Sequence, residues 1–256
     1  DIDLVISDIT PWIFPAADKL GIKSIGISNF TWYDQYKELL DRDRTVETVG
    51  DAYKKADLFL KYPLNLGIEK ARNCEDIGFL CRKFNQEKIS DIKNNIDCNL
   101  DDKKLVFVGI GKSINPDILN KINFDKYDDY CWIFTSGVNI NGDNIYNIPE
   151  NELEIQNYIA ACDYVITKPG WGTVSEALLA KVPMLLLNLT EIPETSKIIR
   201  DITQMKPGLS LNLDDFYNLT NIKDKFSQLD KLNLKKLDYE NSSNQVAQKI
   251  YNYLIS

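Results

Sequence analysis

The segment 163–187 combines two glycines and a carboxylate in an order that suits diphosphate binding. Its sequence is DYVITKPGWGTVSEALLAKVPMLLL, in which one apolar run ends at Thr167 and another begins at Met184. We expect a strand, a turn containing Gly170 and Gly172, and then a helix. Glycine lets backbone approach a ligand closely, and a helix start presents free N–H groups and a positive dipole end. The turn is therefore a candidate anion-binding site.

Glu176, in the same segment, has two interpretations that the sequence leaves open. Thr173 and Glu176 fit a capping box, in which the carboxylate only closes the helix start. Alternatively, Glu176 lies in the first helical turn and accepts hydrogen bonds from the diol of a ribose. Lys168 and Trp171 flank the glycines and complete this candidate binding set.

A second glycine turn occurs in VFVGIGKS, which follows another expected strand. Ligands of open parallel sheets bind beyond the carboxyl ends of the strands, where this turn falls. A Walker A loop is excluded, because Val106 stands where its first glycine is required. The turn either holds a phosphate through backbone N–H groups and a lysine, or is a plain tight connection. Its candidate residues are Gly109, Gly111, Lys112 and Ser113.

Polar residues also follow the first two expected strands, in SDITPW and SNFTW. Asp8 is the only carboxylate so placed in this part of the chain. It is either a candidate general base or a cap for the helix that follows. Trp32 is either a core anchor or a stacking platform. The remaining candidates on this side are Thr10, Asn29 and Thr31.

Composition limits the chemistry further. The 256 residues include no histidine, which excludes Ser-His and Cys-His catalysis and histidine-containing metal sites. We interpret Asp41–Asp43 as solvated charges and expect no metal. The net charge of −8 argues against nucleic-acid binding. No apolar run reaches the roughly 20 residues of a transmembrane helix. Five scattered cysteines without a CxxC pair indicate reduced thiols and a cytoplasmic protein.

Strand and helix patterns alternate in two stretches, which predicts an α/β fold of two Rossmann-like units. We place the units at 1–95 and 96–256, because the polar stretch Asn85–Lys103 is typical of a linker. The segment Asp51–Leu60 is predicted to be helical.

The strings CDYVITKPGWGTVSEALLAKVPMLLL and DLVISDITPWIFPAADKLGIKSIGISNFTW resemble segments of GT-B glycosyltransferases. The nearest types are the MurG-type UDP-N-acetylglucosamine transferases and the transferase-like half of plant arabinokinases. The resemblance implies metal-independent transfer from a nucleotide-sugar, most simply a UDP-sugar, with no further cofactor. It places Gly170, Gly172 and Thr173 at the donor diphosphate and Glu176 on the ribose. The 109–113 loop would contact phosphate, Ile148 would contact the nucleobase, and Glu194 would contact the donor sugar. The resemblance also implies that the last helix crosses back onto the first unit.

The sequence departs from that family in one respect. It has no glycine- and histidine-rich loop after a first strand, so we expect the first unit to lack its opening part. Asp8 is then the only catalytic base on offer, and the acceptor is unknown. Two alternatives stay open, a catalytically silent nucleotide-sugar-binding module or fragment and a nucleotide-sugar epimerase on the same fold. We also consider a homo-oligomer.

Overall fold

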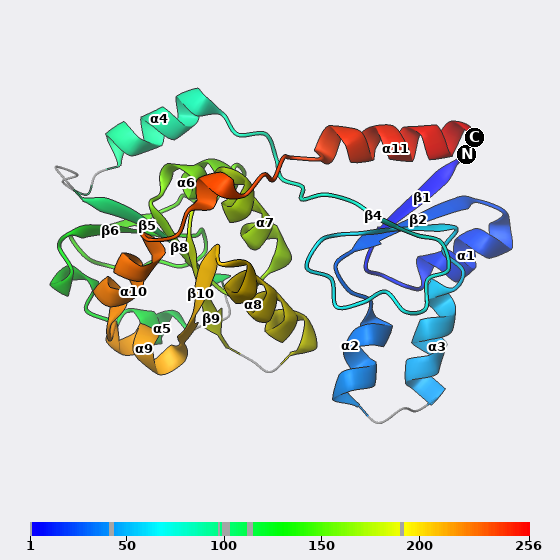
Figure 1. Ribbon diagram of the computed structural model, residues 1–256, viewed down its shortest axis with the longest axis horizontal. Coiled ribbons are helices and arrows are strands. Elements are labelled where there is room, and N and C mark those ends of the chain that lie inside the picture. Colours follow the sequence, from blue (N-terminus) through cyan, green and yellow to red (C-terminus); the bar gives the residue numbers. More distant parts are fainter. Residues whose placement is uncertain (1, 41–43, 97, 99–102, 112–114, 190–191) are drawn as a thin grey trace. The chain divides into compact units, whose positions relative to one another are not determined.

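The computed structural model describes residues 2–40, 44–96, 98, 103–111, 115–189 and 192–256 (Figure 1). Its contacts divide the chain into two compact units, one of residues 1–80, 190–198 and 240–256 and the other of residues 81–189 and 199–239. Helix α8 (Pro193–Met205) contributes residues to both units. The assignment of 1–95 and 96–256 as acceptor-side and donor-binding domains stays a prediction.

The first unit contains a four-stranded parallel sheet in the order β1-β2-β3-β4. Successive side chains of a strand point to opposite faces, and both faces are covered. On β2, Ile25 and Ile27 face one side, while Gly26 admits the rings of Phe14 and Phe59 on the other. The elements of this unit are β1 (Leu4–Asp8), α1 (Ile13–Leu20), β2 (Lys23–Ser28), α2 (Trp32–Leu39), α3 (Arg44–Tyr53), β3 (Leu58–Lys61), β4 (Cys74–Asp76) and α11 (Ser243–Ile255).

The last helix, α11, packs on the sheet of the first unit, as expected from the sequence. Val246 joins the apolar cluster that contains Ile25 and Leu60. The ammonium group of Lys23 donates a hydrogen bond of 3.0 Å to the carbonyl of Tyr253. This arrangement confirms that the chain returns to its first unit after completing the second.

The second unit contains a six-stranded parallel sheet in the order β10-β9-β8-β5-β6-β7. The central strands are almost wholly apolar, as is typical of strands covered on both faces. Helices α9 and α10, drawn in orange in Figure 1, pack toward β9 and β10. The elements are α4 (Gln86–Asn95), β5 (Lys104–Gly109), α5 (Pro116–Leu119), η2 (Phe124–Lys126), β6 (Tyr130–Phe134), β7 (Ile145–Asn147), α6 (Ile155–Ala161), β8 (Tyr164–Thr167), α7 (Trp171–Ala180), β9 (Met184–Asn188), β10 (Gly208–Asn212), α9 (Leu213–Asn218), α10 (Ile222–Leu229) and η3 (Leu234–Lys236).

Two local predictions are wrong. The segment Asp51–Leu60 is not one helix, because α3 ends at Tyr53 and the run from Leu58 forms β3. The stretch Asn85–Lys103 is not a plain linker, because it contains α4, whose N-cap Asn85 accepts a 3.1 Å hydrogen bond from a backbone N–H. Two buried isoleucines of α4 face the second unit, where this helix packs against α6. Among the helices that the structure describes, none is long and apolar enough to cross a membrane.

The expectation of five reduced thiols is also wrong for one pair. Cys98 and Cys131 form a disulfide, with their Cα atoms 5.9 Å apart, within the usual range for such a bond. The sequence spacing of 33 residues does not indicate the pair, because the two positions meet only in the folded unit. Cys74, Cys81 and Cys162, all among the described residues, are not in disulfides.

This pairing predicts the number of titratable thiols. Denatured, unreduced protein is expected to react with a thiol reagent at three cysteines, and reduced protein at five. A Cys98→Ser variant should expose four thiols in the unreduced state, because Cys131 loses its partner. Five reactive thiols in unreduced wild-type protein would contradict the bond.

Candidate donor-binding site

The strand order of the second unit reverses between β5 and β8. From β5 the chain proceeds through β6 to β7 on one side, then returns to β8 and proceeds to β10 on the other. Such a reversal is the point where open parallel sheets bind ligands, beyond the carboxyl ends of the strands. The two strand ends are joined there by a hydrogen bond of 2.7 Å from the Thr167 hydroxyl to the Gly109 carbonyl. Both glycine turns noted in the sequence therefore leave the sheet at this point.

Helix α7 begins at Trp171, two residues earlier than the sequence suggested. Its N-cap is Gly170, which has no side chain with which to cap the helix. Thr173 is thus the third helical residue and Glu176 the sixth, so the capping-box interpretation is wrong. The first turn of a helix carries backbone N–H groups without intrahelical acceptors, together with the positive end of the helix dipole. These groups are aligned for an anion at the β8–α7 turn.

The glycines of the β8–α7 turn are not required by the fold. Among the described residues, apart from chain neighbours and the backbone of α7 itself, no heavy atom would lie within 4 Å of a Cβ atom added at Gly170 or Gly172. Gly109 differs, because its Cβ would lie 2.7 Å from the Phe107 ring. Gly111 has a φ of 51°, a left-handed conformation that favours glycine. Packing or backbone geometry therefore explains the glycines after β5, whereas open space lies in front of those after β8.

Glu176 is half-buried in the second unit, and burial raises the pKa of its carboxyl group. The positive charge of Arg82 acts in the opposite direction and lowers it. Arg82 also donates a hydrogen bond to the carbonyl of Leu153, in the loop between β7 and α6. The neighbouring Cys81 has its pKa raised to about 11, by burial and then by the charge of Glu176. A partly desolvated carboxylate is a strong acceptor for hydroxyl donors such as a ribose diol.

Arg82 was not predicted from the sequence. It lies in the stretch GFLCRKF, which has neither a motif nor a regular hydrophobic pattern. Only the fold brings it near Glu176, ninety-four positions later in the chain by residue number. The remaining members of the β8–α7 set lie where expected: Lys168 is exposed, and Trp171 and Thr173 are half-buried at the helix start.

Ile148 follows β7 and is buried. Its backbone N–H donates a 3.0 Å hydrogen bond to the Phe134 carbonyl. A nucleobase contact through the backbone of Ile148 would therefore use its carbonyl oxygen. Lys112, Ser113 and Asp41–Asp43 lie outside the described residues. Among those described, no group of three or more His, Cys, Asp or Glu side chains could hold a metal ion.

In the first unit, Asp8 ends β1 and is followed by a strained turn. Ile9 has a φ of 63°, which is rare for a β-branched residue and is a form of strain that occurs at functional sites. The Tyr53 hydroxyl holds this turn through the Ile9 carbonyl. Asp8 does not cap α1, whose N-cap is Trp12 without a side-chain hydrogen bond. The turn leaves Asp8 and Thr10 exposed beyond the strand.

Although Asp8 is exposed, partial burial of its carboxyl group raises its pKa. Because folding raises this pKa, the ionised carboxylate lowers the free energy of unfolding at pH values above the folded pKa. This cost disappears as the pH falls through the folded pKa. We therefore expect Asp8→Asn to stabilise the protein at pH 7, by at most about 0.5 kcal/mol because solvent screens the group. At pH 3 the difference should vanish.

Urea unfolding at both pH values measures this difference. The control is Asp3→Asn, which removes an exposed carboxylate just before the same strand. Lower stability of Asp8→Asn at pH 7 would show that Asp8 supports the fold.

The other acceptor-side candidates are mostly engaged within the first unit. Asn29 donates a 2.8 Å hydrogen bond to the carboxylate of Glu194, whose own N–H donates to the Gln35 amide oxygen. Glu194 thus bonds to residues of the first unit, and its contact with the donor sugar stays a prediction. Thr31 is the N-cap of α2. Trp32 is half-buried and packs against the core cluster of this unit, as the core-anchor alternative predicted.

Comparisons with known proteins were made on the sequence and on the fold. No family model matches the sequence. L-arabinokinase of Arabidopsis thaliana is 22% identical over 196 residues, which is 72% of this chain and 18% of that protein. The chain therefore spans less than a fifth of the length of this relative.

Solved glycosyltransferase structures match nearly the whole chain. UGT89C1 of Arabidopsis thaliana matches with a TM-score of 0.68 and 16% identity, covering 98% of this chain and 72% of that one. The calicheamicin glycosyltransferase CalG4 gives 0.63 and 16%, with coverage of 98% and 75%. A UDP-glucosyltransferase from Polygonum tinctorium gives 0.64 and 12%, with coverage of 100% and 76%. The protein therefore has the α/β fold of GT-B glycosyltransferases, with two parallel sheets, which confirms the predicted fold class.

Proposed function

We propose that this protein binds a UDP-sugar through its second unit and takes part in transfer of the sugar. The observation that carries the proposal is the β8–α7 turn. Gly170 is the N-cap of α7 and Gly172 its second residue, the described neighbours leave space in front of both, and the helix starts at the strand reversal of the sheet. This combination suits a diphosphate, and the half-buried Glu176 in the same helix suits a ribose.

Within this proposal the donor-side candidates have separate roles. Gly170, Gly172 and Thr173 hold the diphosphate, Glu176 accepts from the ribose, and Ile148 meets the nucleobase. Glu194 stays proposed for the donor sugar, and Gly109, Gly111, Lys168 and Trp171 for the surroundings of the phosphates. Backbone N–H groups and the helix dipole stabilise the departing diphosphate, so that no metal is needed. Two of the similar structures support the choice of donor by what they contain: UGT89C1 with UDP, and a Phytolacca americana protein with UDP-2fluoro-glucose.

Asp8 is the proposed base, because a carboxylate with a raised pKa is better matched to proton abstraction near neutral pH. Its strained turn keeps the carboxylate exposed beyond β1. Thr10, Asn29, Thr31 and Trp32 remain proposed acceptor-side residues. The hydroxyl of Thr31 is already bonded to Asp34, at 2.5 Å, so its first role is to cap α2. We also keep the cytoplasm as the proposed compartment.

A second candidate function is nucleotide-sugar binding without catalysis. The absence of histidine from the 256 residues favours it, because any general base must then be a carboxylate, lysine or tyrosine. Product analysis separates the candidates. The protein is incubated with UDP-glucose and UDP-N-acetylglucosamine, each with and without a panel of hydroxyl acceptors. Transfer releases UDP and forms a glycoside, epimerisation yields a new sugar, and a silent module changes neither donor.

Binding must be established before these products can be interpreted. Calorimetric titration with UDP is expected to show one site. Folded protein that does not bind UDP would overturn both the transferase and the binding-module proposals.

A further inference from the structure

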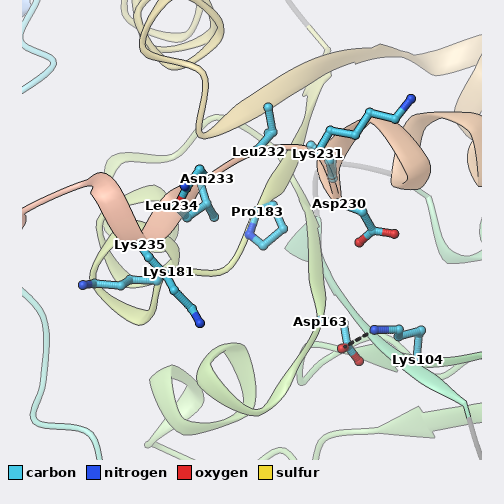
Figure 2. Close-up of a pocket in the computed structure, with 11 residues that line it drawn as sticks. Lys104, Asp163, Lys181, Pro183, Asp230, Lys231, Leu232, Asn233, Leu234 and Lys235 are labelled. Carbon is cyan, nitrogen blue, oxygen red and sulfur yellow. Dashed lines mark hydrogen bonds and ion pairs between the residues drawn. The ribbon is translucent and has the colours of Figure 1, made fainter.

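A pocket lies at the end of the second unit's sheet that is opposite the candidate donor site. It has a volume of about 490 Å³. Lys104 at the start of β5, Asp163 before β8 and Pro183 before β9 line one side, and the segment 229–235 lines the other (Figure 2). Lys104, Asp163 and Pro183 lie at the amino ends of β5, β8 and β9, whereas the candidate donor site lies beyond the carboxyl ends of the strands. The pocket is therefore separate from that site.

The pocket is basic in a protein whose net charge is −8. Four lysines and two aspartates line it. Both aspartates are already engaged. Asp163 accepts hydrogen bonds from the Lys104 ammonium at 3.1 Å and from the Leu105 N–H at 2.9 Å. Asp230 accepts one from the Tyr164 hydroxyl at 2.6 Å. The two lining carboxylates are thus hydrogen-bonded to residues of the sheet strands and not to the remaining lysines.

Lys181 and Lys235 carry the uncompensated charge. In the part of the chain that the structure describes, neither ammonium group has an ion pair or hydrogen bond. Figure 2 shows the two side chains at the same end of the pocket, away from the Lys104–Asp163 pair, and Lys231 extending in another direction. Unpaired positive charges on the lining of one pocket raise the local concentration of anions there.

The backbone at Lys181 is a separate observation. This residue ends α7 in the left-handed conformation, with a φ of 59°, where glycine is the usual choice. A lysine there accepts backbone strain that a glycine would avoid. The strain directs attention to the side chain, because an outlier held by the fold commonly serves a function.

We propose that this pocket binds a small organic phosphate that carries two or more negative charges. Its volume falls within the range of small-molecule sites, roughly 300–1,000 Å³. The ammonium groups of Lys181 and Lys235 would hold the phosphates as point charges. Pro183, Leu232 and Leu234 provide an apolar surface for the rest of the molecule. The proposal does not depend on the function proposed for the β8–α7 turn.

Titration with inorganic pyrophosphate at low ionic strength tests this site. The charge-removing double variant Lys181→Gln/Lys235→Gln is expected to weaken pyrophosphate binding at least tenfold and to leave UDP binding unchanged. The matched control, Lys19→Gln/Lys121→Gln, removes two exposed lysines elsewhere and should bind pyrophosphate like the wild type. Circular dichroism and thermal unfolding establish that each variant is folded.

Three results would overturn the proposal. One is absence of pyrophosphate binding by the wild-type protein. Another is equal weakening in the control, which would indicate a general charge effect. The third is pyrophosphate binding that persists in Lys181→Gln/Lys235→Gln and disappears in Gly172→Val, because the anion would then occupy the β8–α7 turn. Failure of UDP binding alone leaves this proposal intact, so the two proposals fail separately.

Discussion

Replacing Glu176 by alanine is expected to weaken UDP binding by about 1–3 kcal/mol, a loss of roughly 5- to 150-fold. A ribose diol that donates to the carboxylate in the wild type would be left without an acceptor in the variant. Calorimetry at constant pH and salt measures the change. Glu87→Ala, which removes an exposed carboxylate from α4, is the control and should bind UDP with unchanged affinity.

The stability of a Glu176 variant provides a second measurement. Removing the charge should weaken UDP binding but stabilise the folded protein. Burial raises the pKa of Glu176 in the folded protein. The ionised carboxylate therefore costs stability above the folded pKa, and the cost is lost on acidification. Glu176→Gln keeps the side-chain shape, so it should be more stable than the wild type at pH 7 and equal to it in acid.

The two measurements together separate a binding residue from a structural one. Weaker UDP binding with higher stability at pH 7 indicates a carboxylate retained for its ligand. Unchanged UDP affinity together with reduced stability would mean that Glu176 serves the helix alone, and the proposed ribose contact would be wrong.

Glu176 also shows where sequence reasoning reaches its limit at this site. The string Thr173-Val174-Ser175-Glu176 satisfies a capping box, and nothing in the letters excludes it. In the structure, however, helix α7 starts at Trp171 with Gly170 as its N-cap, and not after Thr173. Arg82 could not be found at all, because its relation to Glu176 depends on how a segment without periodicity crosses the unit.

The fold was more predictable than the site. Apolar runs such as those ending at Thr167 and beginning at Met184 became β8 and β9, since a buried parallel strand needs little beyond apolar residues. Prediction failed where polar sequence forms a helix that buries only Ile89 and Ile92, as in α4. It also failed for the Cys98–Cys131 pair, which depends on tertiary contact alone.

The glycines of the β8–α7 turn give the second large effect. Gly172→Val is expected to weaken UDP binding by about 2–4 kcal/mol, because the branched side chain occupies the approach of the diphosphate and removes one or two hydrogen bonds to a charged group. The fold should tolerate the change, since a Cβ at this position has open space around it. Gly172→Ala should even stabilise the protein, by up to about 1 kcal/mol, because glycine is unfavourable within a helix.

Gly109→Ala is the contrasting variant. Its Cβ would meet the Phe107 ring at 2.7 Å and the Thr167 hydroxyl at 3.1 Å, so we expect a loss of about 1–3 kcal/mol in stability. Thermal unfolding and UDP titration of Gly172→Val and Gly109→Ala distinguish a glycine kept for a ligand from one required by packing. If Gly172→Val bound UDP normally, the open space before α7 would not be the diphosphate site. If Gly172→Ala stabilised the protein while Gly172→Val abolished UDP binding, Gly172 would be retained for its ligand at a cost to the stability of helix α7.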